Sequence, residues 1–160
     1  ERAQIAIRQA MQDMPDVAEL SRNVVVEQTP EGLRIQIIDQ EGRSMFAPGD
    51  AAPNDRARRL LVAISGVISQ LPNRLTISGH TDGSTPGGRY NSNFELSAAR
   101  ANEARRILMG QGIPSDRIYE VAGRADSEPM FPDDPTMPGN RRIAITLLRE
   151  APPLPADHDL

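Results

Sequence analysis

The chain has 160 residues and a net charge of −4, with 18 basic residues against 22 acidic ones, so nothing in its charge favours nucleic acid as a partner. This length suits one domain with a substantial core. Cysteine is absent, which excludes disulfides and thiolate metal sites, and lysine is absent, which excludes the Ser-x-x-Lys nucleophile of penicillin-binding proteins.

The N-terminal segment, residues 1–22, begins with the pattern of a short amphipathic helix. Its apolar positions are Ile7, Ala10, Met11 and Met14. Isolated helices of this length are marginal in water, so the segment packs on the domain, pairs with a second copy, joins the domain to a membrane anchor, or frays. We expect a linker that docks as a marginally stable helix. No apolar run reaches the roughly 18 residues of a membrane span, and no signal peptide is visible.

Two strands are predicted next, Val24–Glu27 and Leu33–Asp39, separated by a turn at residues 30–32. The irregular stretch 40–50 follows, and we expect Met45 and Phe46 to fix it to the core. Asn54 is a helix N-cap, and apolar residues recur over the four turns that follow it, up to Leu71.

The next predicted strand, Leu75–Gly79, leads through a long loop into a second helix from about Glu95 to Leu108. A strand over Arg117–Val121 follows. Residues 123–139 carry prolines at a spacing of three and predict an extended loop of polyproline-like character. The last strand is Arg142–Leu148, and residues 150–160 form a polar, proline-rich tail that we expect to be disordered.

The order β-α-β-α-β-β predicts an α/β (α+β) two-layer sandwich, with the helices on one face of a mixed sheet. The predicted domain spans residues 23–149, between the linker segment and the tail.

One residue of the second helix breaks its apolar pattern. Arg100 lies four residues from both Leu96 and Ala104, so its guanidinium projects near the buried face and needs an acceptor. Asp82, just past the strand end, is the nearest candidate. Two interpretations remain open: a structural Arg100–Asp82 ion pair, or two charges that together bind a ligand carrying both.

Catalytic and metal chemistry find little support in the same region. His80, Thr81 and Asp82 provide too few ligands for a metal ion. Nothing places a nucleophilic serine beside His80 for a Ser/His/Asp triad. We therefore expect no enzyme activity, no metal and no cofactor, and interpret His80 as a residue whose hydrogen bonds order the loop.

Three motifs carry a resemblance to a known family. They are Gly-His-Thr-Asp at 79–82, Asn-Phe-Glu-Leu-Ser-Ala-Ala-Arg-Ala at 93–101, and Asn-Arg-Arg at 140–142. Together they resemble the TD, N-x-x-L-S-x-x-R-A and N-R-R pattern of OmpA-like peptidoglycan-binding domains, over roughly residues 17–149. Within that family the chain is most similar to the B subunits of flagellar motor stators. This narrower likeness rests on Gly32–Ile35, Asp39–Gly42, Met45-Phe46, the long loop before Asn93 and Asp134-Pro135.

The resemblance implies the OmpA-like fold and a binding role without catalysis. In that family the aspartate of the TD motif meets the ammonium of diaminopimelate in the peptidoglycan stem peptide, and the arginine of the second motif meets its carboxylate. Here these residues are Asp82 and Arg100, which would form a clamp of charge-assisted hydrogen bonds. Thr81 and Asn93 would shape the loop or contact the ligand, and Arg141 would tether the last strand to the loop.

For a stator B subunit, the resemblance further implies a periplasmic domain of a single-pass inner-membrane protein, whose membrane helix lies upstream. Its partners would be peptidoglycan, a second copy in a homodimer, the stator A subunit, and the P-ring or other basal-body ring proteins. The alternative is a generic OmpA-like domain that tethers the outer membrane to the wall. The two differ in what precedes residue 1.

Overall fold

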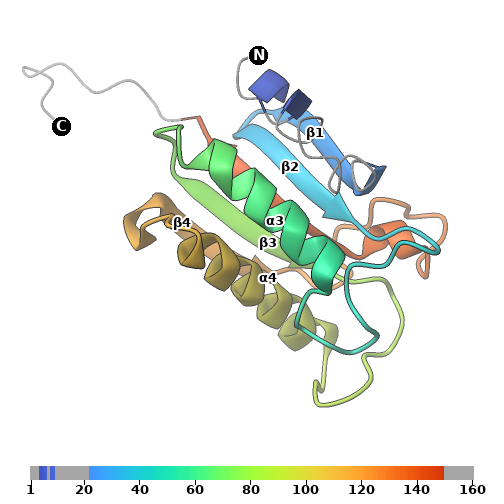
Figure 1. Ribbon diagram of the computed structural model, residues 1–160. Coiled ribbons are helices and arrows are strands. Elements are labelled where there is room, and N and C mark those ends of the chain that lie inside the picture. Colours follow the sequence, from blue (N-terminus) through green and yellow to red (C-terminus); the bar gives the residue numbers. More distant parts are fainter. Residues whose placement is uncertain (1–3, 7, 10–21, 150–160) are drawn as a thin grey trace, which may run out of the picture.

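The computed structural model describes residues 4–6, 8–9 and 22–149 (Figure 1). Its elements are β1 (Val24–Thr29), β2 (Gly32–Ile38), α3 (Asp55–Ile68), β3 (Leu75–His80), α4 (Asn93–Gly110), η2 (Ser115–Arg117), β4 (Ile118–Gly123), η3 (Pro138–Asn140) and β5 (Arg142–Leu148). From β2 to β5 the strands and α-helices follow the predicted order β-α-β-α-β-β. The strand indicated at Val24–Glu27 precedes them as β1.

The five strands form one mixed sheet in the order β1-β2-β5-β3-β4. Only β3 and β4 are parallel; the other neighbours are antiparallel. The last strand in the sequence, β5, therefore lies in the middle of the sheet, between β2 and β3. This agrees with the predicted mixed sheet.

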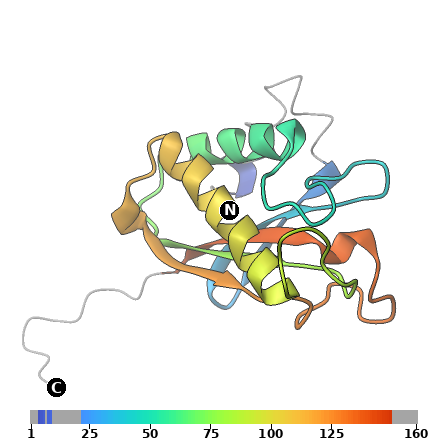
Figure 2. The same cartoon turned by 90° about the horizontal axis from the view of Figure 1, so that it is seen from below.

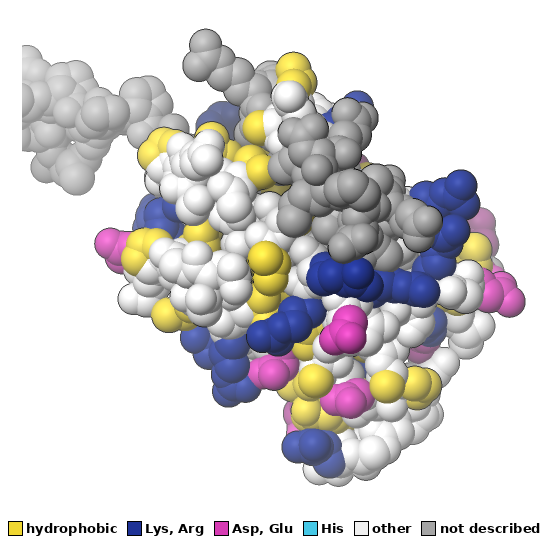
Figure 3. All heavy atoms as spheres, viewed as in Figure 1, with side chains coloured by type: hydrophobic (Ala, Val, Ile, Leu, Met, Phe, Trp, Pro, Cys, Tyr) yellow, Lys and Arg dark blue, Asp and Glu magenta, His cyan; other side chains and the backbone are white. Residues whose placement is uncertain are grey.

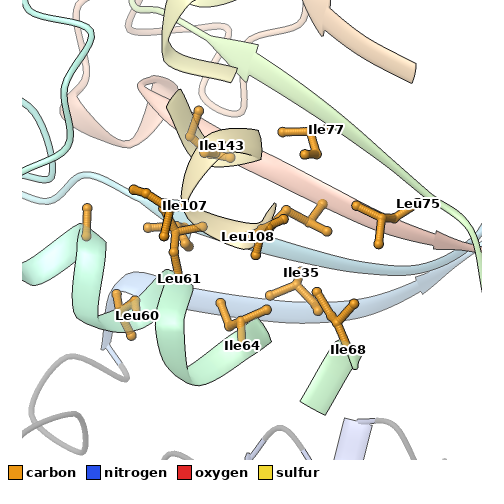
Figure 4. Close-up of a cluster of buried hydrophobic side chains, with 14 of the residues drawn as sticks. Ile35, Leu60, Leu61, Ile64, Ile68, Leu75, Ile77, Ile107, Leu108 and Ile143 are labelled. Carbon is orange, nitrogen blue, oxygen red and sulfur yellow. The ribbon is translucent and has the colours of Figure 1, made fainter. Parts of the chain in front are cut away.

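Both helices cover the same face of the sheet, so the domain has two layers (Figures 1 and 2). Alternating side chains of the strands decide which face is covered: Leu75 and Ile77 of β3 are fully buried, whereas Thr76 and Ser78, which alternate with them, are half-buried on the other face. Figure 4 shows the resulting core, in which Ile64 and Ile68 of α3 lie against Ile35 of β2.

The helix starts follow from capping residues. Asn54 Oδ1 accepts a hydrogen bond from the Ala57 N–H at 3.0 Å, as its predicted N-cap role requires. In α4 the N-cap is Ser92, whose hydroxyl oxygen accepts from the Glu95 N–H at 3.3 Å. This helix begins two residues earlier than predicted, because Asn93 and Phe94 belong to its first turn.

The backbone of α4 lies unusually close to β3. A Cβ atom built on Gly79 would come within 2.1 Å of the Ser97 carbonyl oxygen. Only glycine allows this approach. The contact fixes the height of α4 above the sheet and therefore the position of the loop that joins β3 to α4.

The prediction of a polyproline-like loop over residues 123–139 was wrong. The segment is a series of turns closed by backbone hydrogen bonds, which a polyproline helix lacks. The Asp134 N–H donates to the Phe131 carbonyl at 3.1 Å, and the Met137 N–H donates to the Asp134 carbonyl at 3.0 Å. Proline lacks an N–H, but Pro132 and Pro135 occupy neither donor position and so leave the turns intact.

Most of the predicted linker and the whole predicted tail, residues 150–160, lie outside the described residues, as do the apolar positions Ile7, Ala10, Met11 and Met14. Within the linker, residues 4–6 and 8–9 are helical. The Gln4 side-chain amide donates to the Val26 carbonyl of β1 at 3.3 Å. No helix in the described residues is long and apolar enough to cross a membrane.

Candidate functional site

Strands β2 and β3 end, and strand β5 begins, at the same end of the sheet. Ile38 at the end of β2 and His80 at the end of β3 both pair with Arg142 at the start of β5. The segments that continue from this edge, residues 39–54, 81–92 and 124–141, gather at the same end of the molecule (Figure 1). In that view Figure 3 shows acidic, basic and hydrophobic side chains side by side at this end.

A pocket of about 360 Å³ lies between these segments. All five residues proposed from the sequence line it: Thr81, Asp82, Asn93, Arg100 and Arg141. They come from the loop after β3, from α4 and from the residue before β5. The fold therefore brings together residues that are up to 60 positions apart in the chain.

Asp82 is paired with Arg141 and not with Arg100. Arg141 Nη1 donates to Asp82 Oδ2 at 2.5 Å, and the Ser84 N–H donates to Asp82 Oδ1 at 2.8 Å. The structural Arg100–Asp82 ion pair considered from the sequence is thus replaced by an Arg141–Asp82 pair. The expected tether between the last strand and the loop is present in this contact.

Arg141 also binds a second carboxylate. Its Nε donates to Asp39 Oδ2 at 2.8 Å, while the Met45 N–H donates to Asp39 Oδ1 at 2.6 Å. Burial lowers the pKa of the Arg141 guanidinium, but its hydrogen bonds to Asp39 and Asp82 outweigh this and raise the pKa above its usual value. Arg141 is therefore a fixed cation between two aspartates.

Arg100 is 3% exposed and is held by backbone carbonyls. Its Nε donates to the Asp50 carbonyl at 2.9 Å, and its Nη2 donates to the Ala47 carbonyl at 3.3 Å. The Phe46 ring lies 4.5 Å below the guanidinium carbon. Burial lowers the pKa of Arg100, and the nearby Arg141 cation lowers it further, although Asp39 and Asp82 act in the opposite direction.

Among the described residues, no carboxylate lies within 4 Å of the Arg100 guanidinium. A guanidinium carries five N–H groups, and two of its nitrogens, Nε and Nη2, donate to the two carbonyls. Arg100 can therefore donate to a carboxylate that enters the pocket. The Arg100 guanidinium is thus buried without a direct ion pair. Burial of such a charge is costly unless a ligand or neighbouring dipoles stabilise it.

Two glycine-bearing loops meet beside the pocket. Gly49 has a φ of +69°, and a Cβ built on it would come within 2.6 Å of the Gly87 carbonyl oxygen. Both residues line the pocket. The loop that carries Gly49 also supplies the carbonyls of Ala47 and Asp50, so this contact couples the pocket wall to the position of Arg100.

Thr81 and Asn93 have different surroundings. The Asn93 side-chain amide donates to the Ser84 carbonyl at 2.9 Å and so ties the loop to the start of α4. The Thr81 N–H donates to the Ala125 carbonyl at 2.8 Å, but its buried hydroxyl oxygen has no hydrogen-bond partner among the described residues.

The interpretation of His80 as a loop-ordering residue was wrong. His80 ends β3 on the uncovered face of the sheet, where its Nε2 shares a 2.9 Å hydrogen bond with Ser78 of the same strand. Burial lowers its pKa from 6.5 to about 3, and the cations of Arg142, Arg124 and Arg34 add to this effect. No cluster of three or more potential metal ligands occurs within the described ranges.

Two contributors were missed from the sequence. Asp39 was treated as the end of a strand, although its carboxylate holds Arg141. Phe46 was expected to anchor a loop, and it is buried at 6% exposure, but it also faces Arg100. For Asp39 the available signal was an acidic residue directly after an alternating apolar strand; for the Phe46–Arg100 stacking there was none.

The pocket thus contains an anion, Asp82, and a cation, Arg100, that has N–H groups left to donate. The Arg141–Asp39 ion pair holds the Asp82 carboxylate in place through Arg141. This arrangement can bind a small zwitterionic group through charge-assisted hydrogen bonds at both ends.

Comparisons with known proteins agree with this geometry. The model of the OmpA family matches residues 45–142, which include all the residues that line the pocket except Ser44. Motility protein B of Escherichia coli K12 is 38% identical over 144 residues, covering 89% of this chain and 47% of that protein. The chain thus spans about half the length of this relative.

Solved structures share the fold. The cell wall anchor of the type VI secretion system from Pseudomonas aeruginosa superposes with a TM-score of 0.70 at 27% identity, covering 90% of this chain and 97% of that one. The periplasmic domain of Helicobacter pylori MotB superposes with a TM-score of 0.72 at 22% identity, covering 84% of each chain.

Proposed function

Because this chain belongs to the OmpA family, we propose that it is a non-enzymatic peptidoglycan-binding domain that anchors a flagellar motor stator to the cell wall. The observation that carries the proposal is the pocket, in which Asp82 and Arg100 lie together without a direct ion pair between them. Each charge is held by other groups and remains able to bind the opposite end of a zwitterion.

The ligand that fits this arrangement is the side chain of diaminopimelate in the stem peptide, which ends in an ammonium and a carboxylate. Asp82 binds the ammonium and Arg100 binds the carboxylate. Asn93 fixes the loop that carries Asp82, Thr81 offers a hydroxyl beside it, and Arg141 orients the Asp82 carboxylate through the 2.5 Å hydrogen bond.

The stator assignment rests on the 38% identity to Motility protein B, which extends over 89% of this chain. In this proposal residues 23–149 are the wall-binding domain in the periplasm, residues 1–22 link it to a membrane helix, and residues 150–160 are a tail. Its partners are peptidoglycan, a second copy of the chain, a stator A subunit, and ring proteins of the basal body.

A second candidate is the wall anchor of another envelope assembly, or a generic tether of the outer membrane. The cell wall anchor of the type VI secretion system favours it, because this chain covers 97% of that structure at 27% identity. Both candidates use the same pocket and differ in the machine that is held.

The experiment that tests wall binding is cosedimentation with purified diaminopimelate-type peptidoglycan. The protein should sediment with the wall and release no soluble muropeptides, and added salt should weaken the binding. Asp82→Asn keeps an acceptor for the Ser84 N–H but removes the charge, so it should abolish sedimentation. Asp116→Asn, an exposed aspartate elsewhere on the surface, is the matched control and should bind as the parent does.

The stator role is tested separately. The chain is fused behind the membrane segment of Escherichia coli Motility protein B and expressed in cells that lack this protein. Restored swimming supports the stator; wall binding without restored swimming supports the second candidate. Muropeptide release by the purified protein would overturn the non-enzymatic function itself.

A further inference from the structure

Phe94 is a large apolar side chain exposed to water, and it directly follows a residue that lines the pocket. It is the second residue of α4, and its side chain is 60% exposed. The preceding residue, Asn93, lines the pocket and donates to the Ser84 carbonyl. An exposed phenyl ring gives up the free energy of burial, and one placed next to a binding site offers a contact surface to whatever the site holds.

The aromatic residues of this chain are few and unevenly placed. There are three Phe and two Tyr in 160 residues; Phe46, Tyr90 and Phe131 lie in the segments that build the pocket end, and Phe94 lies in the first turn of α4, directly after one of them. Phe46 is buried under Arg100, and the Arg89 guanidinium lies 6.0 Å from the Tyr90 ring. In the described part of the chain no arginine lies over the Phe94 ring.

The backbone under Phe94 is rigid. Ser92 caps the helix: its hydroxyl oxygen accepts from the Glu95 N–H at 3.3 Å, and its hydroxyl donates to Glu95 Oε1 at 3.4 Å. The Ser97 hydroxyl also donates to the Phe94 carbonyl at 3.1 Å. The backbone that carries the ring is therefore already ordered, so no backbone entropy is lost when a ligand covers the ring.

This further step rests on the proposed function. We propose that the Phe94 ring is a stacking platform for a sugar ring of the glycan strand whose stem peptide enters the pocket. Sugar rings have faces of C–H groups that pack on aromatic rings and exclude water from both. A stem peptide reaches at most about 3.3–3.6 Å per residue. A sugar a few residues away from the bound zwitterion is therefore close enough to reach the first turn of α4, which begins at the pocket-lining Asn93.

Tyr119 provides a matched control. It is also 60% exposed, but it lies on β4, and the Arg74 guanidinium carbon is 4.7 Å from its ring centre. Arg74 directly precedes β3, whereas the pocket follows the end of β3. Tyr119 thus has the same exposure at the opposite end of the sheet.

The test compares two ligands in titration calorimetry: a disaccharide carrying a diaminopimelate stem peptide, and the same stem peptide without sugar. Phe94→Ala should weaken binding of the first about fivefold, the size of a single aromatic contact, and leave binding of the second unchanged. Phe94→Tyr should restore the loss, and Tyr119→Ala should change neither. Equal losses for both ligands, or no loss for either, would overturn the platform.

A second measurement uses the absence of tryptophan from the chain. In Phe94→Trp the new indole is the sole tryptophan, so its emission reports this position alone. The disaccharide ligand should shift the emission and the sugar-free peptide should not; the reverse would exclude sugar stacking. If the parent protein binds neither ligand, the proposed function fails, which is a different outcome from a parent that binds both equally well.

Discussion

Arg141 and Asp82 are joined across the edge of the sheet by a 2.5 Å hydrogen bond between Nη1 and Oδ2. The bond connects the residue before β5 to the loop after β3, 59 positions earlier in the chain. It orients the Asp82 carboxylate in the absence of a ligand, so under the proposed function a ligand ammonium would meet an anion that is already positioned.

Replacing Arg141 should destabilise the protein strongly. In Arg141→Gln the Asp39 carboxylate, whose side chain is 1% exposed, loses its cationic partner and stays buried. Leaving one partner of a buried ion pair costs about 3–5 kcal/mol, and the partial exposure of Arg141 reduces this to about 2–4 kcal/mol. Urea unfolding followed by circular dichroism measures the change.

Arg106→Gln is the control for that substitution. Arg106 forms an ion pair with Glu103 on the surface of α4, where its side chain is 67% exposed. Such pairs contribute at most about 1 kcal/mol. Equal effects of the two substitutions would show that Arg141 contributes no more than a surface charge.

The contact between the two glycine-bearing loops gives a second prediction. Gly49→Ala introduces a Cβ that clashes with the Gly87 carbonyl and also requires a positive φ. The loop must shift, which moves the carbonyls that hold Arg100. Peptidoglycan binding should fall at least tenfold, measured by cosedimentation at increasing wall concentration.

Gly42→Ala is a control that introduces the backbone strain of a positive φ without a steric clash. Gly42 also has a positive φ, +78°, but nothing lies within 4 Å of its Cβ position. It should cost about 1 kcal/mol of stability and leave binding intact. A Gly42 variant that binds as weakly as the Gly49 variant would show that the contact with Gly87 is irrelevant to the pocket.

His80 predicts acid sensitivity. Its pKa is lowered from 6.5 to about 3 in the folded protein, mainly by burial. Between these two values the unfolded chain binds more protons than the folded one, so stability falls as pH decreases. From pH 7 to pH 4 the loss is about 3 kcal/mol, measured by urea unfolding at each pH.

His80→Gln should remove this part of the pH dependence. The comparison with the parent is essential because burial raises the pKa of Asp39, which gives a slope of the opposite sign. His158→Gln, which alters the second histidine, outside the described residues, is the control. An unchanged slope in His80→Gln would mean that His80 is not buried in its neutral form.

The close approach of α4 to β3 gives a fourth prediction. Gly79→Ala places a Cβ 2.1 Å from the Ser97 carbonyl oxygen, and both atoms belong to rigid elements. Overpacking of this kind costs about 1–3 kcal/mol or more. Thermal unfolding should show a large decrease in Tm.

Gly66→Ala is the control for this substitution. Gly66 lies on the exposed side of α3, away from the helix ends. Nothing lies within 4 Å of its Cβ position, so the change should raise stability by about 0.5–1 kcal/mol through helix propensity alone. If both glycine variants lose stability, the loss at Gly79 does not report helix–sheet packing.

Local patterns predicted most of the fold. The alternation of Leu33, Ile35 and Ile37 identified β2, and Asn54 identified the start of α3, because each depends on neighbouring residues only. The proline-rich loop was mispredicted, because proline restricts φ without deciding whether the chain between prolines forms turns.

The residues of the candidate site could be predicted from the sequence, but the hydrogen bonds and ion pairs between them could not. Arg100 was found because a charge in an apolar stripe is visible in the sequence. Its partners were not, because Asp82 binds Arg141, and Arg100 binds carbonyls of a loop some 50 positions away. Such pairing depends on strand order, which places β5 between β2 and β3.

That strand order also has a consequence for folding during synthesis. Of the five strands of the sheet, β5 is the last to be synthesised, yet it lies in the middle of the sheet and directly follows Arg141. In a nascent chain that ends before residue 141, the β1–β2 hairpin and the β3–α4–β4 unit can both be present. They cannot join into one sheet, because β5, which lies between β2 and β3, is missing. The pocket is therefore assembled only after β5 has been synthesised and has paired with β2 and β3.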